Sequence, residues 1–173
     1  FIPQVEKLKV GDPTQYDTEV GPLIASNEVL RVDQWVKDAV ESGAQLLCGG
    51  SPLSESTYKP TVLLNPSDEA LVSTNEVFGP VLAVYEYSDL EDAFERANSV
   101  PYCFQASIFT KDLDLALEAT ARLKAQTVLV NDHTAFRVDW MPFGGSEKSG
   151  YGIGGIGPSM RDMTIEKMMV FHS

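Results

Sequence analysis

Cysteine and histidine are scarce in this sequence. Its 173 residues include two of each, Cys48 and Cys103, and His133 and His172. Two cysteines without a CxxC pair provide no disulfide framework and are typical of a reducing compartment, so we expect a cytoplasmic protein. None of the four lies at the spacing of metal ligands, so we also expect no metal site.

Positive charge is equally limited, with 13 Lys and Arg against 25 Asp and Glu, a net charge of −12. Nucleic acids and anionic membrane surfaces both favour clustered cations, so neither is an expected partner. No run of 18 apolar residues is available for a transmembrane helix. The first residues lack the basic and apolar regions of a signal peptide. They also lack an initiator Met, so we expect a piece of a longer chain.

Apolar residues make up 43% of the chain and charged residues 22%, as in an ordinary globular domain. Apolar patterns predict strands and helices in alternation through the middle of the chain. The predicted segments are a strand at 81–87, a helix after 88, a strand at 105–110, a helix at 113–123 and a strand at 127–130. This order predicts an α/β fold with a mainly parallel sheet, flanking helices and right-handed crossovers.

Local signals place the ends of these elements. Asn27 is the expected N-cap of an earlier helix that Gly43 ends. Ser88 and Glu91 have the spacing of a capping box. Further strands are expected at 45–48 and 58–64, and a β-prone run at 164–171, whereas no regular element fits the glycine-rich residues 150–157. Three apolar stripes are predicted: Val29, Val32, Val36, Ala39 and Val40; Leu90, Ala93, Phe94 and Ala97; Leu113, Ala116, Leu117, Thr120 and Leu123.

Residues 127–150 are the segment in which we most expect a functional site. A short strand, expected to be buried on both faces, leads into a long connection with Arg137, Trp140, Phe143 and a Gly-Gly pair. Ligands of open parallel sheets bind beyond the carboxyl ends of the strands, so this connection is a candidate site. An ordinary crossover loop with aromatic residues packed beneath it is the alternative.

Four short motifs occur together: VGDP at 10–13, GPLI at 21–24, NEVFGP at 75–80 and PFGG at 142–145, with Ser149-Gly150 after the last. In this order they resemble the aldehyde dehydrogenase superfamily, and the similarity runs from about residue 9 to residue 171. NDHTAFR at 131–137 and SMRDMT at 159–164 are most similar to phosphonoacetaldehyde dehydrogenases.

The resemblance implies that residues 1–163 are the C-terminal part of the catalytic domain and residues 164–173 an oligomerisation strand. The parent would oxidise an aldehyde to a carboxylate with NAD or NADP, as a homodimer or homotetramer. Its nucleophilic Cys and base Glu would lie outside this chain, which therefore has no catalytic residue and is expected to be inactive alone. Cys48 and Cys103 are expected to be small packing residues. A stand-alone binding or regulatory module of the same fold is the alternative.

Two cofactor-binding residues follow from the resemblance. The residue that matches Glu76 accepts hydrogen bonds from the hydroxyls of the nicotinamide ribose, a role suited to a carboxylate because it offers only acceptors. The residue that matches Phe78 holds the nicotinamide ring. Without the resemblance, an exposed loop Glu and a core Phe would be the simpler interpretation.

The resemblance also places Arg137 where many members have an aromatic residue lining the aldehyde tunnel. A guanidinium in a partly dry tunnel matches a phosphonate, phosphate or carboxylate, so we expect an anionic tail on the aldehyde. Phosphonoacetaldehyde is the first candidate and succinic semialdehyde the second. His133 would add a donor and Phe143 would line the site. The alternative is a surface ion pair of Arg137 with Asp132 or Asp139.

Two features depart from a complete dehydrogenase. Glu147 occupies the position where the family usually has Lys, and Lys148 follows it. The GxG sequence within residues 150–155 lacks the strand–turn–helix context of a dinucleotide fingerprint. The dinucleotide fold is therefore expected outside this chain, together with the residues that choose between NAD and NADP.

Overall fold

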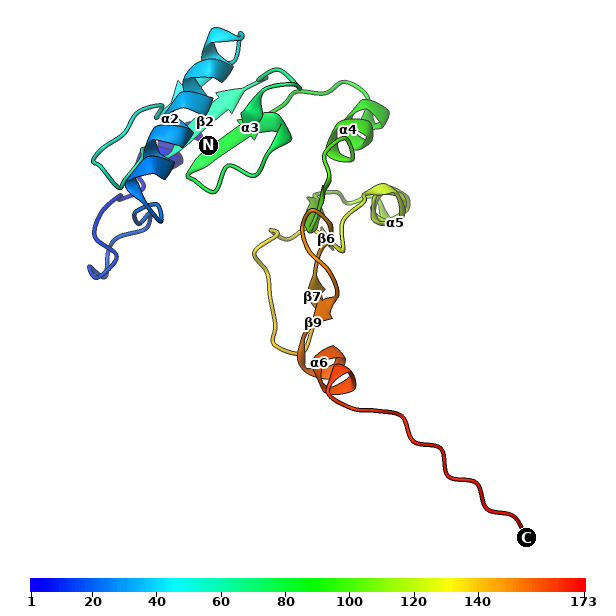
Figure 1. The fold of residues 1–173 in the computed structure, drawn as a ribbon. Helices are drawn as coiled ribbons and strands as arrows, with labels where there is room; N and C mark the ends of the chain where they lie inside the picture. Colours follow the sequence, from blue (N-terminus) through cyan, green and yellow to red (C-terminus); the bar gives the residue numbers. More distant parts are fainter. The chain divides into compact units, whose positions relative to one another are not determined.

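The computed structural model describes all of residues 1–173 and divides the chain into two compact units, Phe1–Tyr87 and Ser88–Ser173. Figure 1 colours the first from blue to green and the second from green to red. None of the helices combines the length and the hydrophobicity that crossing a membrane requires.

Unit 1 is a helix packed on a small mixed sheet. The strands follow the order β1-β2-β3, with β1 antiparallel and β3 parallel to β2. The elements are α1 (Ile2–Val5), α2 (Ser26–Glu41), β1 (Gln45–Cys48), β2 (Thr61–Leu64), α3 (Leu71–Thr74) and β3 (Val81–Val84). The core forms between α2 and the sheet, where Val32 and Val36 pack in one cluster with Leu63.

Helix α2 confirms most of its predicted stripe, since Val29, Val32, Val36 and Ala39 are all buried. The prediction that Val40 belongs to the buried stripe is wrong, because Val40 lies about 100° around the helix from Ala39 and is exposed. The fifth buried residue of the helix is instead the polar Asp33.

The ends of α2 are partly as predicted. Gly43 has a φ of +107° just after the helix, as a residue that ends a helix at C′ does. Asn27 is not the N-cap: the helix begins at Ser26 after an extended Ala25, and no side chain caps it. The Asn27 amide bonds the side chain of Glu28 instead.

A buried polar pair joins α2 to the chain that leads into β2. The Tyr58 side chain is fully buried, and its hydroxyl donates to Asp33 Oδ1 at 3.2 Å. Lys37 Nζ lies 2.6 Å from the other oxygen of the same carboxylate. Burial, and then the neighbouring Asp33 carboxylate, raise the pKa of Tyr58 above its ordinary value of 10.0. Strand β2 begins at Thr61 rather than at the predicted residue 58, because the backbone of Tyr58 forms a bridge to Pro52 and Pro60 has no N–H to donate to the sheet.

We expect Tyr58→Phe to lower the free energy of unfolding by about 1–2 kcal/mol, because one acceptor of a buried carboxylate loses its donor. The pH dependence has a defined sign. A raised pKa in the folded state contributes stability below about pH 10 that is lost as the pH rises above it, and Tyr58→Phe should lack this loss. Urea unfolding as a function of pH measures both effects. Tyr16→Phe, at an exposed position, is the control, and an equal loss in both variants would contradict the assignment.

Unit 2 contains one parallel and two antiparallel strand pairs. Strands β5 and β6 are parallel, whereas β4 pairs with β8 and β7 with β9 antiparallel. The elements are α4 (Leu90–Ala97), β4 (Tyr102–Cys103), β5 (Gln105–Ile108), α5 (Leu113–Arg122), β6 (Thr127–Val130), β7 (Phe143–Gly144), β8 (Ser146–Glu147), β9 (Ile153–Gly154) and α6 (Ile156–Asp162). The α/β class is confirmed: the sheet of unit 1 is mixed, and unit 2 combines parallel and antiparallel pairs with its helices.

Several local predictions in unit 2 are corrected. Helix α4 is capped by Asp89, which accepts from Glu91 N, rather than by Ser88. Strand β6 is half-buried rather than buried on both faces. The glycine-rich residues 150–157, predicted to be irregular, contain β9 and the start of α6.

The apolar stripes of unit 2 are only partly buried. Phe94 is buried in α4, and Ala116 is buried in α5 together with Ala119, which the pattern did not single out. The predicted positions that are exposed are Leu90, Ala97, Leu113, Leu117 and Thr120. Helix α5 therefore packs through its small alanines, which allow a close approach, rather than through its leucines.

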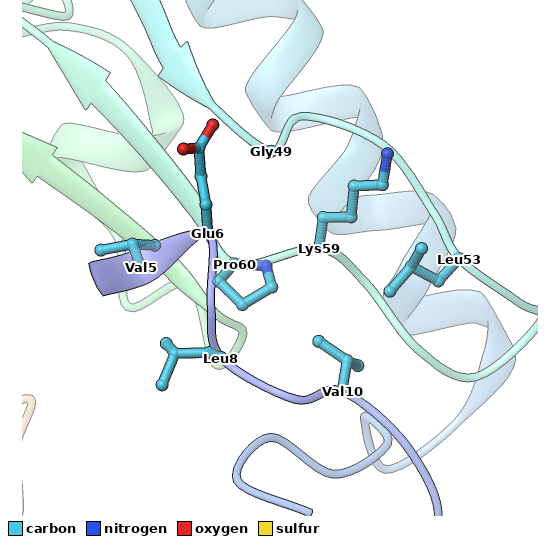
Figure 2. Close-up of a pocket in the computed structure, with 8 residues that line it drawn as sticks. All are labelled: Val5, Glu6, Leu8, Val10, Gly49, Leu53, Lys59 and Pro60. Carbon is cyan, nitrogen blue, oxygen red and sulfur yellow. The ribbon is translucent and has the colours of Figure 1, made fainter. Parts of the chain in front are cut away.

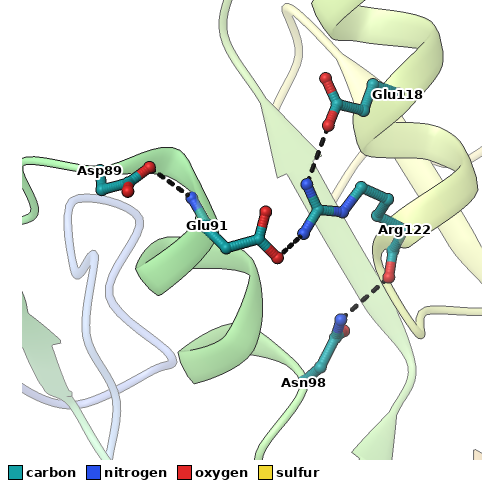
Figure 3. A network of polar contacts seen from close by, with 5 residues as sticks. All are labelled: Asp89, Glu91, Asn98, Glu118 and Arg122. Carbon is teal, nitrogen blue, oxygen red and sulfur yellow. Dashed lines mark hydrogen bonds and ion pairs between the residues drawn. The ribbon is translucent and has the colours of Figure 1, made fainter.

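Arg122 is the main polar link between α4 and α5. Figure 3 shows its guanidinium between the carboxylates of Glu91 and Glu118, with Nη1 2.8 Å from the latter. The guanidinium also lies 4.4 Å from the centre of the Phe94 ring. Asn98, just after α4, donates to the Arg122 carbonyl at 2.9 Å and accepts from the backbone amide of Lys124 at 2.8 Å. The two helices are thus joined at both the side chain and the backbone of one residue.

The last ten residues contain no helix or strand (Figure 1). The apolar members of this segment are all exposed: Ile165, Met168, Met169, Val170 and Phe171. The strand predicted at 164–171 is therefore not paired within the chain, and its role in oligomerisation stays a prediction.

Candidate functional site

Two loops, one in each unit, carry the predicted site residues apart from Phe143, which lies in β7. In unit 1 the 75–80 loop connects α3 to β3 and is packed against the core at two points. The Val77 side chain contacts the buried cluster. Gly79 lies so close to α2 that an added Cβ would be 3.0 Å from Val32 Cγ2, which favours glycine at this position.

Glu76 and Phe78 stand on either side of Val77 and are both exposed. The Glu76 carboxylate has no hydrogen-bond partner in the structure, so its acceptors are available to a ligand. Phe78 is 80% exposed, which rules out the alternative of a core Phe. An exposed free carboxylate beside an exposed ring can accept hydrogen bonds from the hydroxyls of a ligand and pack against a flat group.

Phe78 also has an unusual backbone, with a φ of +47°. Left-handed conformations are costly for a bulky residue and persist where the surrounding structure determines them. An exposed aromatic ring held in such a conformation is typical of a functional position rather than of a packing one.

In unit 2 the 131–142 loop starts from a fixed point. Asn131 is left-handed, with a φ of +60°. Its side-chain amide bonds both backbone groups of Thr110, at 2.9 and 2.8 Å, across the ends of β5 and β6. The Ser107 hydroxyl donates to the carbonyl of Asp132. The loop therefore leaves the carboxyl end of the parallel pair in a set direction.

The structure brings Arg137 and Phe143 together. The Arg137 guanidinium carbon lies 4.0 Å from the centre of the Phe143 ring, and Phe143 in turn makes an edge-to-face contact with Phe104 at 5.1 Å. Neither Asp132 nor Asp139 forms an ion pair with Arg137, so the surface-brace alternative is not what the structure shows. Arg137 is exposed within this chain, and its place in the aldehyde tunnel of a longer parent stays a prediction.

His133 is not brought to Arg137 by any contact. Its side chain is 72% exposed and lies 3.8 Å from the carboxylate of the adjacent Asp132. Its backbone carbonyl accepts from Phe136 N, which forms a turn in the loop. Phe104 was not predicted as a neighbour of Phe143, because an edge-to-face partner from a distant part of the sequence leaves no local signal.

A cavity of about 370 Å³ lies beside Phe143, between Phe104 and the glycine-rich turns. Its polar groups include Ser149, whose hydroxyl accepts from Cys103 N at 3.1 Å, as well as Ser159 and Asp162. The Ser149-Gly150 motif thus helps to fix β4 beside β8.

A second cavity, of about 430 Å³, lies in unit 1 and is lined by none of the predicted site residues (Figure 2). Most of the residues that line it are apolar, and Glu6 and Lys59, which form no ion pair with each other, are also among them. The two cysteines are elsewhere and both are buried, Cys48 in β1 and Cys103 in β4, as expected for packing residues.

Residues 1–169 match the family model described as "Aldehyde dehydrogenase family". The chain belongs to the aldehyde dehydrogenase family. It is 40% identical over 169 residues to a 3-sulfolactaldehyde dehydrogenase of Priestia aryabhattai, covering 98% of this chain and 35% of that protein.

Solved aldehyde dehydrogenase structures show the same fold. Aldehyde dehydrogenase 21 from Physcomitrella patens, in complex with the reaction product succinate, superposes with a TM-score of 0.90 at 39% identity, over 94% of this chain and 34% of that one. The glyceraldehyde-3-phosphate dehydrogenase GapN from Methanocaldococcus jannaschii, complexed with NADP, gives 0.88 at 34% identity, over 94% and 35%. The chain spans about a third of the length of these relatives.

The positive φ of Phe78 predicts how substitutions at this position affect stability. Because glycine adopts positive φ without strain, Phe78→Gly should be more stable than Phe78→Ala by about 1 kcal/mol, the reverse of their order at an ordinary loop position. Chemical unfolding of the two variants measures the difference. The same pair at Tyr87, which is exposed and has no positive φ, is the control. A less stable glycine variant at position 78 would mean that the left-handed conformation is absent in solution.

Proposed function

We propose that this chain is the C-terminal part of the catalytic domain of an NAD(P)-dependent aldehyde dehydrogenase, which oxidises a short aldehyde with an anionic tail to its carboxylate. The observation that carries the substrate class is the contact of Arg137 with Phe143. The aromatic ring covers one face of the guanidinium, and no carboxylate neutralises its edge. The in-plane N–H groups are then available to an anion.

The chemistry of the relatives supports an anionic tail. Sulfolactaldehyde carries a sulfonate, succinate a second carboxylate and glyceraldehyde 3-phosphate a phosphate, and each offers two anionic oxygens that an arginine fork can bond together. Phosphonoacetaldehyde and succinic semialdehyde remain our first two candidates. Phe143 would line the site beside Arg137, and His133 would add a donor from the start of the loop.

The cofactor is assigned to the 75–80 loop. The Glu76 carboxylate would accept hydrogen bonds from the nicotinamide ribose, and the exposed Phe78 ring would hold the nicotinamide face. When bound, NAD or NADP supplies the acceptor for the hydride that leaves the aldehyde carbon. This chain's own contribution is to bind and orient the cofactor and the aldehyde, because its two cysteines are buried and unsuited to attack.

A neutral aldehyde is the second candidate substrate. A lactaldehyde dehydrogenase of Methanococcus vannielii is 38% identical over 172 residues, and lactaldehyde has a hydroxyl in place of a charged tail. A non-catalytic binding or regulatory module of the same fold remains the alternative from another functional class.

Arg137→Leu in the full-length enzyme separates these possibilities. Loss of a charged hydrogen bond should cost on the order of 2–4 kcal/mol in kcat/KM for succinic semialdehyde, and nearly nothing for butanal, which has the same carbon chain without the carboxylate. Steady-state kinetics with both aldehydes measures the difference. Arg161→Leu removes an exposed cation of α6 and controls for net charge. Equal losses for both aldehydes would make Arg137 a structural residue and remove the anionic-tail assignment.

We also propose that the enzyme is a homodimer or homotetramer assembled through residues 164–173. An exposed apolar segment in extended form is suited to add a strand to the sheet of a neighbouring subunit. Ile165→Lys with Val170→Lys should therefore reduce the mass of the assembly measured by size-exclusion chromatography with light scattering. Glu166→Lys in the same segment is the charge control. An unchanged mass in the double variant would contradict this role of the segment.

A further inference from the structure

Arg31, on α2, makes three contacts that fix its guanidinium. Nε lies 2.6 Å from the Glu28 carboxylate, one turn earlier on the helix. The guanidinium carbon is 4.4 Å from the centre of the Trp35 ring, one turn later. Nη2 donates to the backbone carbonyl of Val77 at 2.7 Å. With the side chain only 27% exposed, these contacts form in a partly desolvated setting.

The bond to Val77 spans 46 positions in the sequence and is the only one of the three that leaves the helix. Glu28 and Trp35 orient the guanidinium within α2, and the remaining edge points at the loop. A lysine has no planar fork and stacks poorly, so it would reproduce the bond without the orientation.

The bonded carbonyl belongs to the peptide group that joins Val77 to Phe78. Fixing this peptide plane constrains the φ of Phe78, which is the left-handed +47°. A strained backbone conformation of this kind persists only where contacts with the surrounding structure hold it in place. Val77 packing into the core and Gly79 against Val32 hold the loop on either side of the bonded group.

We propose that Arg31 is a positioning residue for the cofactor: through the Val77 carbonyl it holds the turn that presents Glu76 and Phe78 to the nicotinamide riboside. The proposal rests on the proposed function, and deepens it by naming a residue outside the loop on which cofactor affinity depends. Arg31 itself touches no reacting group. Neither its place in the middle of α2 nor any sequence motif marks it.

The test compares Arg31→Met, Arg31→Lys and a matched control, Lys37→Met, in the full-length enzyme. Lys37 is also a cation of α2 with a carboxylate partner at 2.6 Å, but it makes no bond to the loop. For each variant we would measure the dissociation constant for NAD(P)H by fluorescence, the KM values for cofactor and aldehyde, and the free energy of unfolding.

We expect Arg31→Met to weaken cofactor binding about tenfold, as the loss of one charged hydrogen bond would, and to raise the KM for cofactor more than that for aldehyde. Arg31→Lys should recover part of the affinity. Lys37→Met should lose stability without losing cofactor affinity. Backbone hydrogen exchange without cofactor should rise at residues 75–80 in Arg31→Met and remain unchanged at 61–64.

A double-mutant cycle with Phe78→Ala adds a readout that a merely structural role would not move. If Arg31 acts through the turn at Phe78, the Arg31→Met effect on cofactor binding should shrink in the Phe78→Ala background. Cofactor affinity within twofold of the Lys37→Met value, or full additivity in the cycle, would overturn the proposal and leave Arg31 as a brace. If Glu76→Gln weakens cofactor binding while Arg31→Met does not, only the role of Arg31 fails. A wild-type enzyme that binds neither NAD nor NADP would overturn the proposed function and this role together.

Discussion

The packing of α2 on the three-stranded sheet is the constraint on which unit 1 depends. Its buried stripe fills the space above β2, and two polar contacts leave the helix from neighbouring positions. Asp33 anchors Tyr58 ahead of β2, while Arg31 bonds the carbonyl of Val77 ahead of β3. One helix thus positions both the sheet and the loop that we assign to the cofactor, so a change in α2 should be felt in both.

In unit 2, too, a few residues connect most of the elements. Arg122 joins α4 to α5 through its side chain and its carbonyl. Strands β5 and β6 are parallel, so their carboxyl ends lie at the same edge of the pair. Asn131 closes that edge by bonding Thr110, and the loop that carries Arg137 starts from there. The contact between Arg137 and Phe143 then returns the loop to β7. These contacts together set the position of Arg137, the candidate substrate contact.

The sequence predicted what periodicity and local motifs can carry. It placed α2, β1 and β6 well, because buried stripes and short apolar runs are set by neighbours along the chain. It failed at α5, where Leu113 and Leu117 are exposed and the alanines are buried, because the pattern does not show which face meets a partner. Two-residue strands such as β9 were missed because their pairing is long-range.

Some residues of the site could be predicted from the sequence, whereas the contacts that hold them could not. Glu76, Phe78 and Arg137 came from motifs and resemblance, and their exposure is compatible with ligand contact. The positive φ of Phe78 and the bond from Arg31 have no local signature. Both arise only once α2 and the 75–80 loop are side by side, so no reading of either segment alone would reveal them.

We assign the nicotinamide riboside to the 75–80 loop, which α2 holds in place. A crystal structure of the full-length enzyme with NAD or NADP would test this assignment. We expect hydrogen bonds from the ribose hydroxyls to the Glu76 carboxylate, the nicotinamide against the Phe78 ring, and an intact bond from Arg31 to the Val77 carbonyl. A cofactor whose ribose is bound by other residues, with the 75–80 loop free of contact, would contradict it.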